Sequence, residues 1–241
     1  MPATAAPSAQ SILDELKPLG GDGYKRILLK HGINEPIYGV KVADLKKIQK
    51  RIKKDYQLAL DLYDTGVYDA MYLAGLIADD AKMTPKDLQH WADTANSATL
   101  CGYTVPWVAA GSNHGREMAL KWIESKKPAV AVAGWNTLSC LAALKEDSDL
   151  DLKEYQQLLD RITRSIHSQP DKVRYAMNAF IISTGAYIKS LTASALAAAK
   201  KIGKVEVDMR DTACKVPDVA QYINKIKARG SIGKKRKTVK C

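Results

Sequence analysis

The sequence predicts an all-α protein built as an α-α superhelix, that is, a solenoid of HEAT-like or armadillo-like helix pairs. Three observations support this prediction. The 241-residue chain is rich in Ala and Leu and contains a single Phe, a composition that favours helices over sheets. No stretch alternates apolar and polar residues in the way that a half-buried strand does. Finally, four prolines are spaced at intervals that match a helix-pair repeat.

The four prolines stand where helices are expected to begin. Proline suits the first helical position because its missing N–H group would have no partner there. The intervals between them are 43, 42 and 47 residues, and helix-pair repeats of the HEAT and armadillo kinds span about 40–47 residues. An ordinary helical bundle with coincidental prolines is the alternative. The prolines are Pro85, Pro128, Pro170 and Pro217.

In the first half of the chain, residues 1–10 consist mostly of Ala, Pro, Ser and Thr and are predicted to be a disordered leader. A first helix is expected from residue 11 to the glycines at 20–23, and a second over 24–30. Apolar residues at i, i+3, i+6 and i+10 predict an amphipathic helix that begins at Val42 and ends near Ile52. Thr84 and Asp87 resemble a helix cap before the helix at Pro85.

In the second half, each interval between prolines has room for two helices. The predicted helices cover 128–144, 152–167, 170–183 and 191–202. The sequence is therefore divided into a single HEAT-like domain over residues 11–225 and a basic C-terminal tail over residues 226–241.

The net charge of +11 is concentrated in the tail. Eight cations and no acid lie between Lys225 and Cys241, so the preceding body carries a net charge of only +3. A cationic run of this kind can bind phosphates and release counterions, or it can be a solvated tail.

Several classes of protein are not indicated. No apolar run approaches the roughly 20 residues of a membrane span, and the N-terminus lacks the features of a signal peptide. The four cysteines are scattered, which favours a reducing compartment. No HExxH or CxxC motif occurs. We therefore expect no membrane partner, no metal and no cofactor, and a cytoplasmic location, associated with the nucleoid if the source is bacterial.

One segment carries a family resemblance. Residues 35–48, which include Tyr38-Gly39-Val40 followed by a helix with Leu45 and Ile48, resemble the entry segment of the DNA alkylation repair family, the AlkD-like DNA glycosylases. The resemblance continues through the acidic helix start at Tyr68-Asp69 and covers roughly residues 11–205.

The resemblance implies a solenoid of HEAT-like repeats that grips duplex DNA in its concave face. It also implies removal of N3- or N7-alkylated purines, such as 3-methyladenine and 7-methylguanine, by cleavage of the N-glycosidic bond. The reaction develops a cationic sugar, which carboxylates stabilise by charge and aromatic rings by cation–π contact. The family's pattern places a Trp and an Asp four residues apart on a central helix, an Arg in the next repeat and a Trp in the one after.

This chain departs from that pattern. No Asp or Glu occurs between Thr94 and Arg116. If Tyr103 takes the Trp position, Trp107 takes the Asp position; if Trp107 takes the Trp position, the Asp position falls on Gly111. The Arg position falls near Val132 and the last Trp position near Ala179. None of the family's catalytic residues therefore carries over.

The candidates that remain are aromatic, amide and cationic residues. Aromatic groove residues can stack on an exposed nucleotide, although burial between repeats is the common fate of Trp. The catalytic candidates are Tyr103, Trp107 and Trp135, and the other groove candidates are Asn136, Tyr175 and Asn178. The predicted DNA-binding residues are Lys121, Lys126, Lys127, Lys172, Arg174, Lys234, Lys235, Arg236 and Lys237.

Three functions follow as alternatives. The chain is a DNA alkylation repair glycosylase with a different residue set, a catalytically inactive member that binds DNA by shape and charge, or a solenoid scaffold for protein partners. The expected partner is duplex DNA, and the expected oligomeric state is a monomer. The missing carboxylate predicts weak or absent excision of simple methylated bases.

Overall fold

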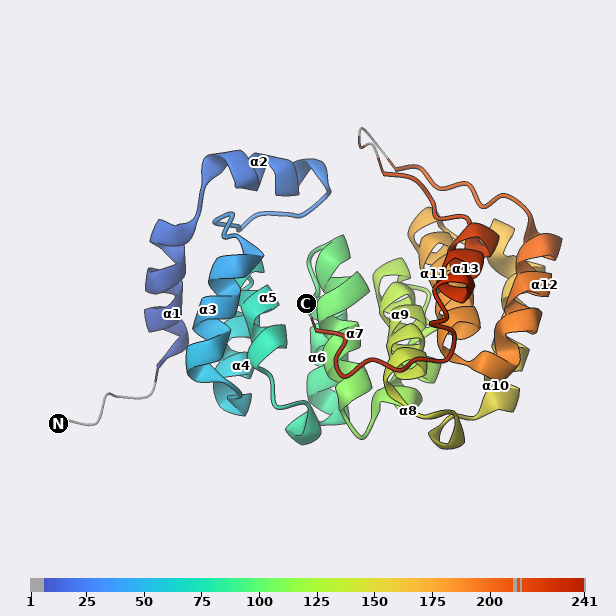
Figure 1. The fold of residues 1–241 in the computed structure, drawn as a ribbon. Coiled ribbons are helices and arrows are strands. Elements are labelled where there is room, and N and C mark those ends of the chain that lie inside the picture. Colours follow the sequence, from blue (N-terminus) through green and yellow to red (C-terminus); the bar gives the residue numbers. More distant parts are fainter. Residues whose placement is uncertain (1–6, 210–211, 213, 241) are drawn as a thin grey trace. The chain divides into compact units, whose positions relative to one another are not determined.

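The computed structural model describes residues 7–209, 212 and 214–240, and every regular element in that part of the chain is a helix (Figure 1). The all-α prediction is thus confirmed. The chain forms two compact units: residues 1–112 together with 240–241, and residues 113–239. The leader predicted over residues 1–10 lies partly outside the described residues, and the first helix begins inside it, at Ala9, with a capping box between Ser8 and Ser11.

In unit 1, α4 packs on α5, and α5 also contacts α3. The core includes Tyr63 of α4, whose ring stacks on Trp91 of α6 at 4.0 Å and whose hydroxyl donates to the Trp91 carbonyl. The helices of unit 1 are α1 (Ala9–Leu16), α2 (Asp22–Lys30), α3 (Val42–Ile52), α4 (Tyr56–Asp64), α5 (Tyr68–Ile77), α6 (Pro85–Thr94) and α7 (Val105–Gly111).

In unit 2, α9 packs against both α8 and α11, while α10 packs against α12 and α13 against α11. Trp135 of α9 and Phe180 of α11 meet edge to face in its core, at 5.3 Å between ring centroids. The helices of unit 2 are α8 (Gly115–Trp122), α9 (Pro128–Leu144), α10 (Leu152–Ser165), α11 (Asp171–Tyr187), α12 (Thr192–Ile202) and α13 (Val219–Ala228).

The prolines mark helix starts with two corrections. Pro85 and Pro128 are the first residues of α6 and α9, as the spacing predicted. Pro170 is instead the N-cap of α11, because its extended backbone (ψ 149°) keeps it outside the helix. Pro217 precedes the N-cap of α13, which is Asp218, whose carboxylate accepts a hydrogen bond from the Gln221 N–H.

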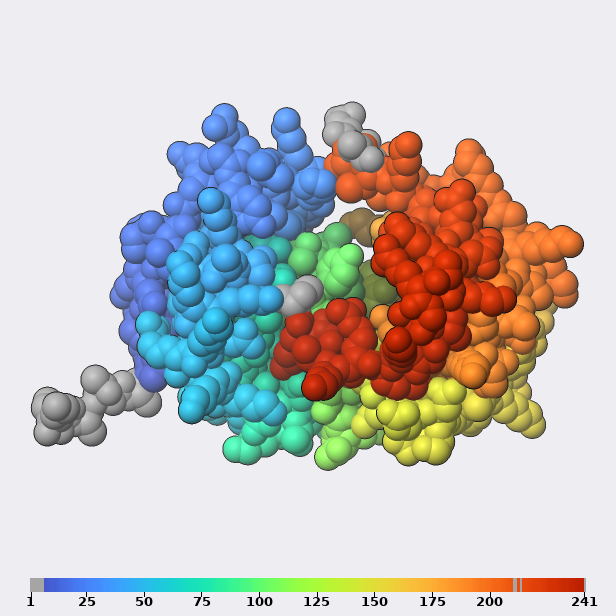
Figure 2. Space-filling view, in the orientation of Figure 1, coloured from blue at the N-terminus to red at the C-terminus, as the bar shows by residue number. Residues whose placement is uncertain are grey.

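The C-terminal tail follows α13 and is exposed at the surface in the view of Figure 2. The Gly233 N–H donates to the Ala186 carbonyl at the end of α11, and the Arg236 N–H donates to the Ala143 carbonyl at the end of α9. Regular structure thus continues to Ala228, past the predicted boundary at residue 225, and the segment after it is held by backbone hydrogen bonds.

Candidate nucleic-acid interface

A row of four aromatic rings runs from the core of unit 1 to its surface. Tyr68 and Tyr72, one helical turn apart on α5, have ring centroids 6.3 Å apart. Tyr72 meets the Trp107 ring edge to face at 5.5 Å, and Trp107 lies 6.2 Å from Tyr103. The first three are buried, whereas 52% of Tyr103 is exposed. The row therefore ends in one ring that is open to solvent.

A π-helical turn over Leu100–Thr104 presents Tyr103. Pro106 follows this turn as the second residue of α7. Because proline has no N–H group, it cannot donate to the carbonyl one turn before it, and the Val105 N–H bonds to Leu100, five residues back. Such π-turns are frequent at functional sites. An exposed ring backed by other rings is the kind of platform on which a nucleobase stacks.

One turn beyond Trp107, Gly111 lies against a carboxylate from another element. A Cβ atom added at Gly111 would lie 2.8 Å from Cγ of Asp80 and would overlap its carboxylate. Asp80 belongs to the short helix over Asp80–Lys82. If Trp107 takes the family's Trp position and Gly111 its Asp position, a carboxylate does lie beside Gly111, but it belongs to Asp80.

That carboxylate is paired with Lys240 near the C-terminus. The Lys240 Nζ atom lies 2.7 Å from Oδ1 of Asp80 and 3.3 Å from the Ala78 carbonyl. Only 15% and 16% of the two side chains are exposed. Burial lowers the pKa of the Lys240 amine even though Asp80 opposes it, and burial raises the pKa of Asp80 even though Lys240 opposes it. Both shifts favour the neutral form.

Exposed charges flank this pair. Lys54 lies 3.6 Å and Lys82 3.8 Å from the carboxylate of Asp79, and both lysines are about two-thirds exposed. The cluster of three lysines and two aspartates has a net positive charge when all five groups are ionised, so it favours an anion such as a phosphate.

Asp69, another carboxylate near the aromatic row, has a structural role. It is fully buried and accepts three backbone hydrogen bonds, from the N–H groups of Tyr38 at 2.6 Å, Gly39 at 3.3 Å and Val40 at 2.7 Å. These bonds hold the segment between α2 and α3 against the N-terminus of α5. Of the two, Asp80 is thus the carboxylate that adjoins Gly111.

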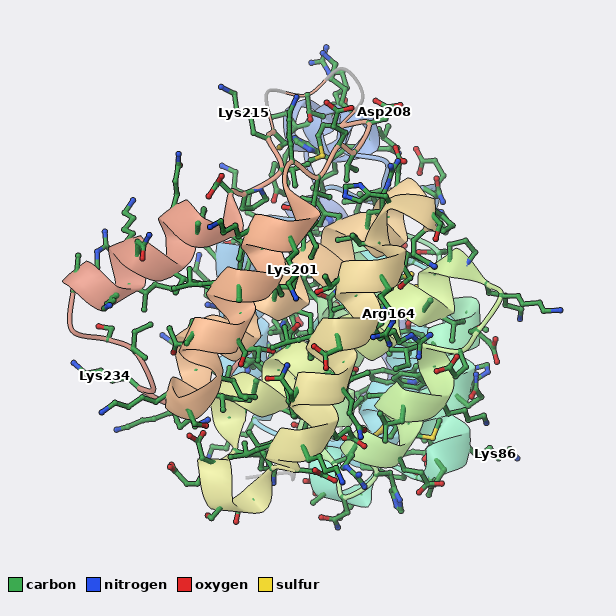
Figure 3. All side chains as sticks on the ribbon, turned by 90° about the vertical axis from the view of Figure 1, so that its right-hand side faces the viewer. Lys86, Arg164, Lys201, Asp208, Lys215 and Lys234 are labelled. Carbon is green, nitrogen blue, oxygen red and sulfur yellow. The ribbon has the colours of Figure 1, made fainter. Side chains whose placement is uncertain are left out.

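In unit 2, the predicted DNA-binding residues fall at two opposite ends of the α9–α11 layer. Lys126 and Lys127 precede α9, and Lys172 and Arg174 lie in the first turn of α11. The tail, by contrast, crosses the C-terminal ends of the same two helices, at Ala186 and Ala143. The structure therefore divides these residues into two basic clusters. Figure 3 shows Lys234 of the tail far from Lys215 and Asp208, which lie in the segment between α12 and α13.

The exposed and engaged members of these clusters can be distinguished. Arg174 is half-buried and forms an ion pair with Asp171. The amide of Asp208 and then the Arg174 guanidinium hold the pKa of Asp171 below its usual range. Lys235 donates to the Ala142 carbonyl and lies 2.8 Å from Asp147. The exposed cations are Lys121, Lys126, Lys127, Lys172, Lys234, Arg236 and Lys237.

The remaining candidates from the sequence are mostly structural. Trp135 is fully buried, with the Arg161 guanidinium carbon 5.7 Å from the centre of its ring, so it is a core residue and not a groove residue. Asn178 is also buried and donates to the Pro217 carbonyl. Asn136 and Tyr175 are half-buried. A cavity of about 1130 Å³ lies between α11, α12 and the segment after α12, and lysines of its lining are Lys200, Lys204 and Lys215.

The described residues contain no group of three or more His, Cys, Asp or Glu side chains that could hold a metal ion. No single helix in this part of the chain is long and apolar enough to cross a membrane, although α11 and the helices after it, bent by 116°, pass that test as a pair by length and composition.

The chain matches known proteins over most of its length. The family model described as DNA alkylation repair enzyme matches residues 12–215. An uncharacterized protein of Listeria innocua, Lin0241, is 34% identical over 221 residues, which cover 89% of this chain and 95% of that protein. A Listeria monocytogenes protein, Lmo0209, also uncharacterized, is 33% identical over the same shares.

A solved structure is similar to the whole chain. It superposes with a TM-score of 0.90 and 33% identity, over 98% of this chain and 100% of the other. That protein is described as belonging to a new family related to the HEAT-like repeat DNA glycosylases, with affinity for branched DNA structures. The similarity confirms the α-α solenoid of HEAT-like helix pairs that the proline spacing predicted.

Proposed function

Since this chain belongs to the DNA alkylation repair enzyme family, we propose that it binds DNA, and branched DNA in preference to plain duplex, with little or no excision of alkylated purines. The preference for branched DNA rests on the relative with 33% identity and a TM-score of 0.90. Duplex DNA remains the partner expected for the arms of such a structure, and the protein acts as a monomer.

The proposal of little or no excision rests on the residue at position 111, which is a glycine. In the register that gives Trp107 the family's Trp position, the resemblance places a catalytic carboxylate at Gly111, and glycine has none. The neighbouring Asp80 carboxylate already lies 2.7 Å from the Lys240 amine, so its charge is largely neutralised. Removing one such stabiliser of developing charge typically costs about 10²–10³ in rate.

A binding experiment tests the proposed preference for branched DNA. A labelled four-way junction and a duplex of equal length are titrated with the protein at several salt concentrations. We expect tighter binding to the junction and a logarithm of affinity that falls linearly with the logarithm of salt concentration, because phosphate contacts release counterions. Equal affinities would refute the branched preference, and a flat salt slope would favour a protein scaffold.

Excision through Asp80 is the second candidate, because its carboxylate lies where a side chain at residue 111 would lie. DNA containing 7-methylguanine or 3-methyladenine is incubated with the protein, and abasic sites are counted. Release well above spontaneous loss that disappears in Asp80→Asn would establish this candidate and overturn the non-excising proposal. Release that disappears in Trp107→Ala but persists in Asp80→Asn would indicate an aromatic site.

A further inference from the structure

Lys240 is an unusual lysine for a C-terminal tail. Its side chain is 15% exposed, and its amine is held by Asp80 and the Ala78 carbonyl beside the second position of the Trp107–Gly111 face. Lysines normally keep the amine in water because desolvation of an unpaired ammonium is costly. Lysine acts as a nucleophile toward carbonyl carbon where its amine is taken out of water or lies beside another cation.

We propose that Lys240 forms a Schiff base with the aldehyde of an abasic site in DNA, which gives unit 1 a lyase activity on that substrate. The inference rests on the DNA binding proposed above. The exposed ring of Tyr103 and the exposed amines of Lys54 and Lys82 give unit 1 the means to hold the strand, by stacking and by phosphate contact. The substrate class is the product of any reaction that removes a base.

The local charges set the amine's reactivity. Burial lowers the pKa of Lys240, Asp80 and Asp79 raise it, and the neighbouring Lys54 lowers it, with a net lowering. Each unit by which an amine's pKa falls toward neutrality raises its unprotonated fraction about tenfold. Asp80 is placed to take the proton that the ammonium must lose before attack.

The steps balance without an oxidant or reductant. The Lys240 ammonium gives a proton to Asp80, and the free Nζ attacks C1′ of the ring-opened sugar, forming a C–N bond. The C1′ hydroxyl leaves as water to give an iminium ion. The Asp80 carboxylate, whose proton has left with that water, takes a C2′ proton. The C3′–O bond then breaks, and the 3′ phosphate leaves as a monoester. Water then hydrolyses the imine, which releases the unsaturated aldehyde and restores the amine.

Lys25 offers a control in the same unit. Its amine lies 2.8 Å from the Glu35 carboxylate and 30% of its side chain is exposed, but it belongs to α2, which carries none of the residues of the Lys240 site. Substitution by arginine at either position keeps the positive charge and the ion pair but removes the nucleophilic amine.

The test is reductive trapping. The full chain is incubated with a labelled oligonucleotide containing one abasic site, borohydride is added, and the covalent complex is measured on a denaturing gel. Lys240→Arg should lose about tenfold or more of the trapped product, whereas Lys25→Arg should trap as the wild type does. Mass spectrometry of the wild-type complex should locate the sugar on Lys240. Thermal melting checks that the variants are folded.

The other outcomes are distinct. Equal trapping by the two variants, or an adduct spread over exposed lysines, overturns the inference. Tight binding of abasic DNA without trapping also overturns it and leaves the proposed DNA binding intact. If the protein binds no DNA, the proposed function fails, and the inference is then tested by borohydride trapping of 2-deoxyribose 5-phosphate. No adduct, or an adduct on a residue other than Lys240, overturns the inference.

Discussion

The Asp69 carboxylate gives a quantitative test of how unit 1 is held together. In Asp69→Asn the side chain keeps its size but loses its charge, and one of its two oxygens becomes an NH₂ group. The wild-type oxygens accept from the N–H groups of Tyr38 and Gly39 on one side and of Val40 on the other. The amide therefore leaves at least one buried N–H facing another donor.

A buried hydrogen bond to a charged group is worth about 1.5–3 kcal/mol, and an unsatisfied buried donor costs about 1–3 kcal/mol. The expected loss in free energy of unfolding is therefore about 3 kcal/mol. For a protein of this size that loss lowers the melting temperature by about 6–12 °C. Urea denaturation and thermal melting followed by circular dichroism measure the two quantities.

Asp61→Asn is the matched control. Asp61 lies on α4 and is exposed, and its carboxylate accepts a hydrogen bond from Gln57 one turn earlier. This substitution should change the free energy of unfolding by less than about 0.5 kcal/mol. If Asp69→Asn were as mild as its control, the three short backbone contacts would not stabilise the fold, and the reasoning about this segment would be wrong.

Two further predictions concern Gly111 and Asp87. Gly111→Ala should lower the free energy of unfolding by about 1–3 kcal/mol, since its Cβ would overlap the Asp80 carboxylate. Thermal melting measures this loss against Gly23→Ala, whose added Cβ meets nothing within 4 Å, and equal melting temperatures of the two variants would contradict the prediction. Burial raises the pKa of Asp87, but hydrogen bonds from Thr84 and Tyr56 outweigh it and hold the pKa below 3.8. The stability that Asp87 contributes is therefore present above the pKa of the unfolded state and is lost as pH falls through the pKa of the folded state. Asp87→Asn should accordingly flatten the decline in melting temperature below about pH 4. Parallel pH profiles for the variant and the wild type would refute this role of Asp87.

Local signals in the sequence were enough to predict several helices. The bounds of α9 were predicted to the residue, and the apolar spacing from Val42 to Ile52 located α3. Thr84 and Asp87 form the capping box that their spacing suggested. Helix starts at Pro170 and Pro217 were misplaced by one or two residues, since a proline is equally at home just before a helix.

The candidate site was harder to predict because its contacts are distant in sequence. The contact between Asp80 and Lys240 joins residues 160 positions apart, and nothing in a basic tail distinguishes Lys235 and Lys240, whose side chains are largely covered, from its other lysines. Trp107 and Trp135 occur in similar apolar helices, yet only Trp107 adjoins an exposed ring. The sequence signal that was available was Pro106, which falls where a continuous α-helix would need an N–H group and so indicates the irregular turn before α7.

The separation of the two basic clusters in unit 2 sets a minimum footprint on nucleic acid. The α9 helix has 17 residues, and at 1.5 Å per residue its ends are about 25 Å apart. Phosphates along one strand of duplex DNA advance about 3.4 Å per base pair, so a duplex that reaches both Lys127 and Arg236 must extend over at least about seven base pairs. Shorter duplexes can occupy only one end of the layer, and affinity for duplex DNA should therefore rise in a step near that length.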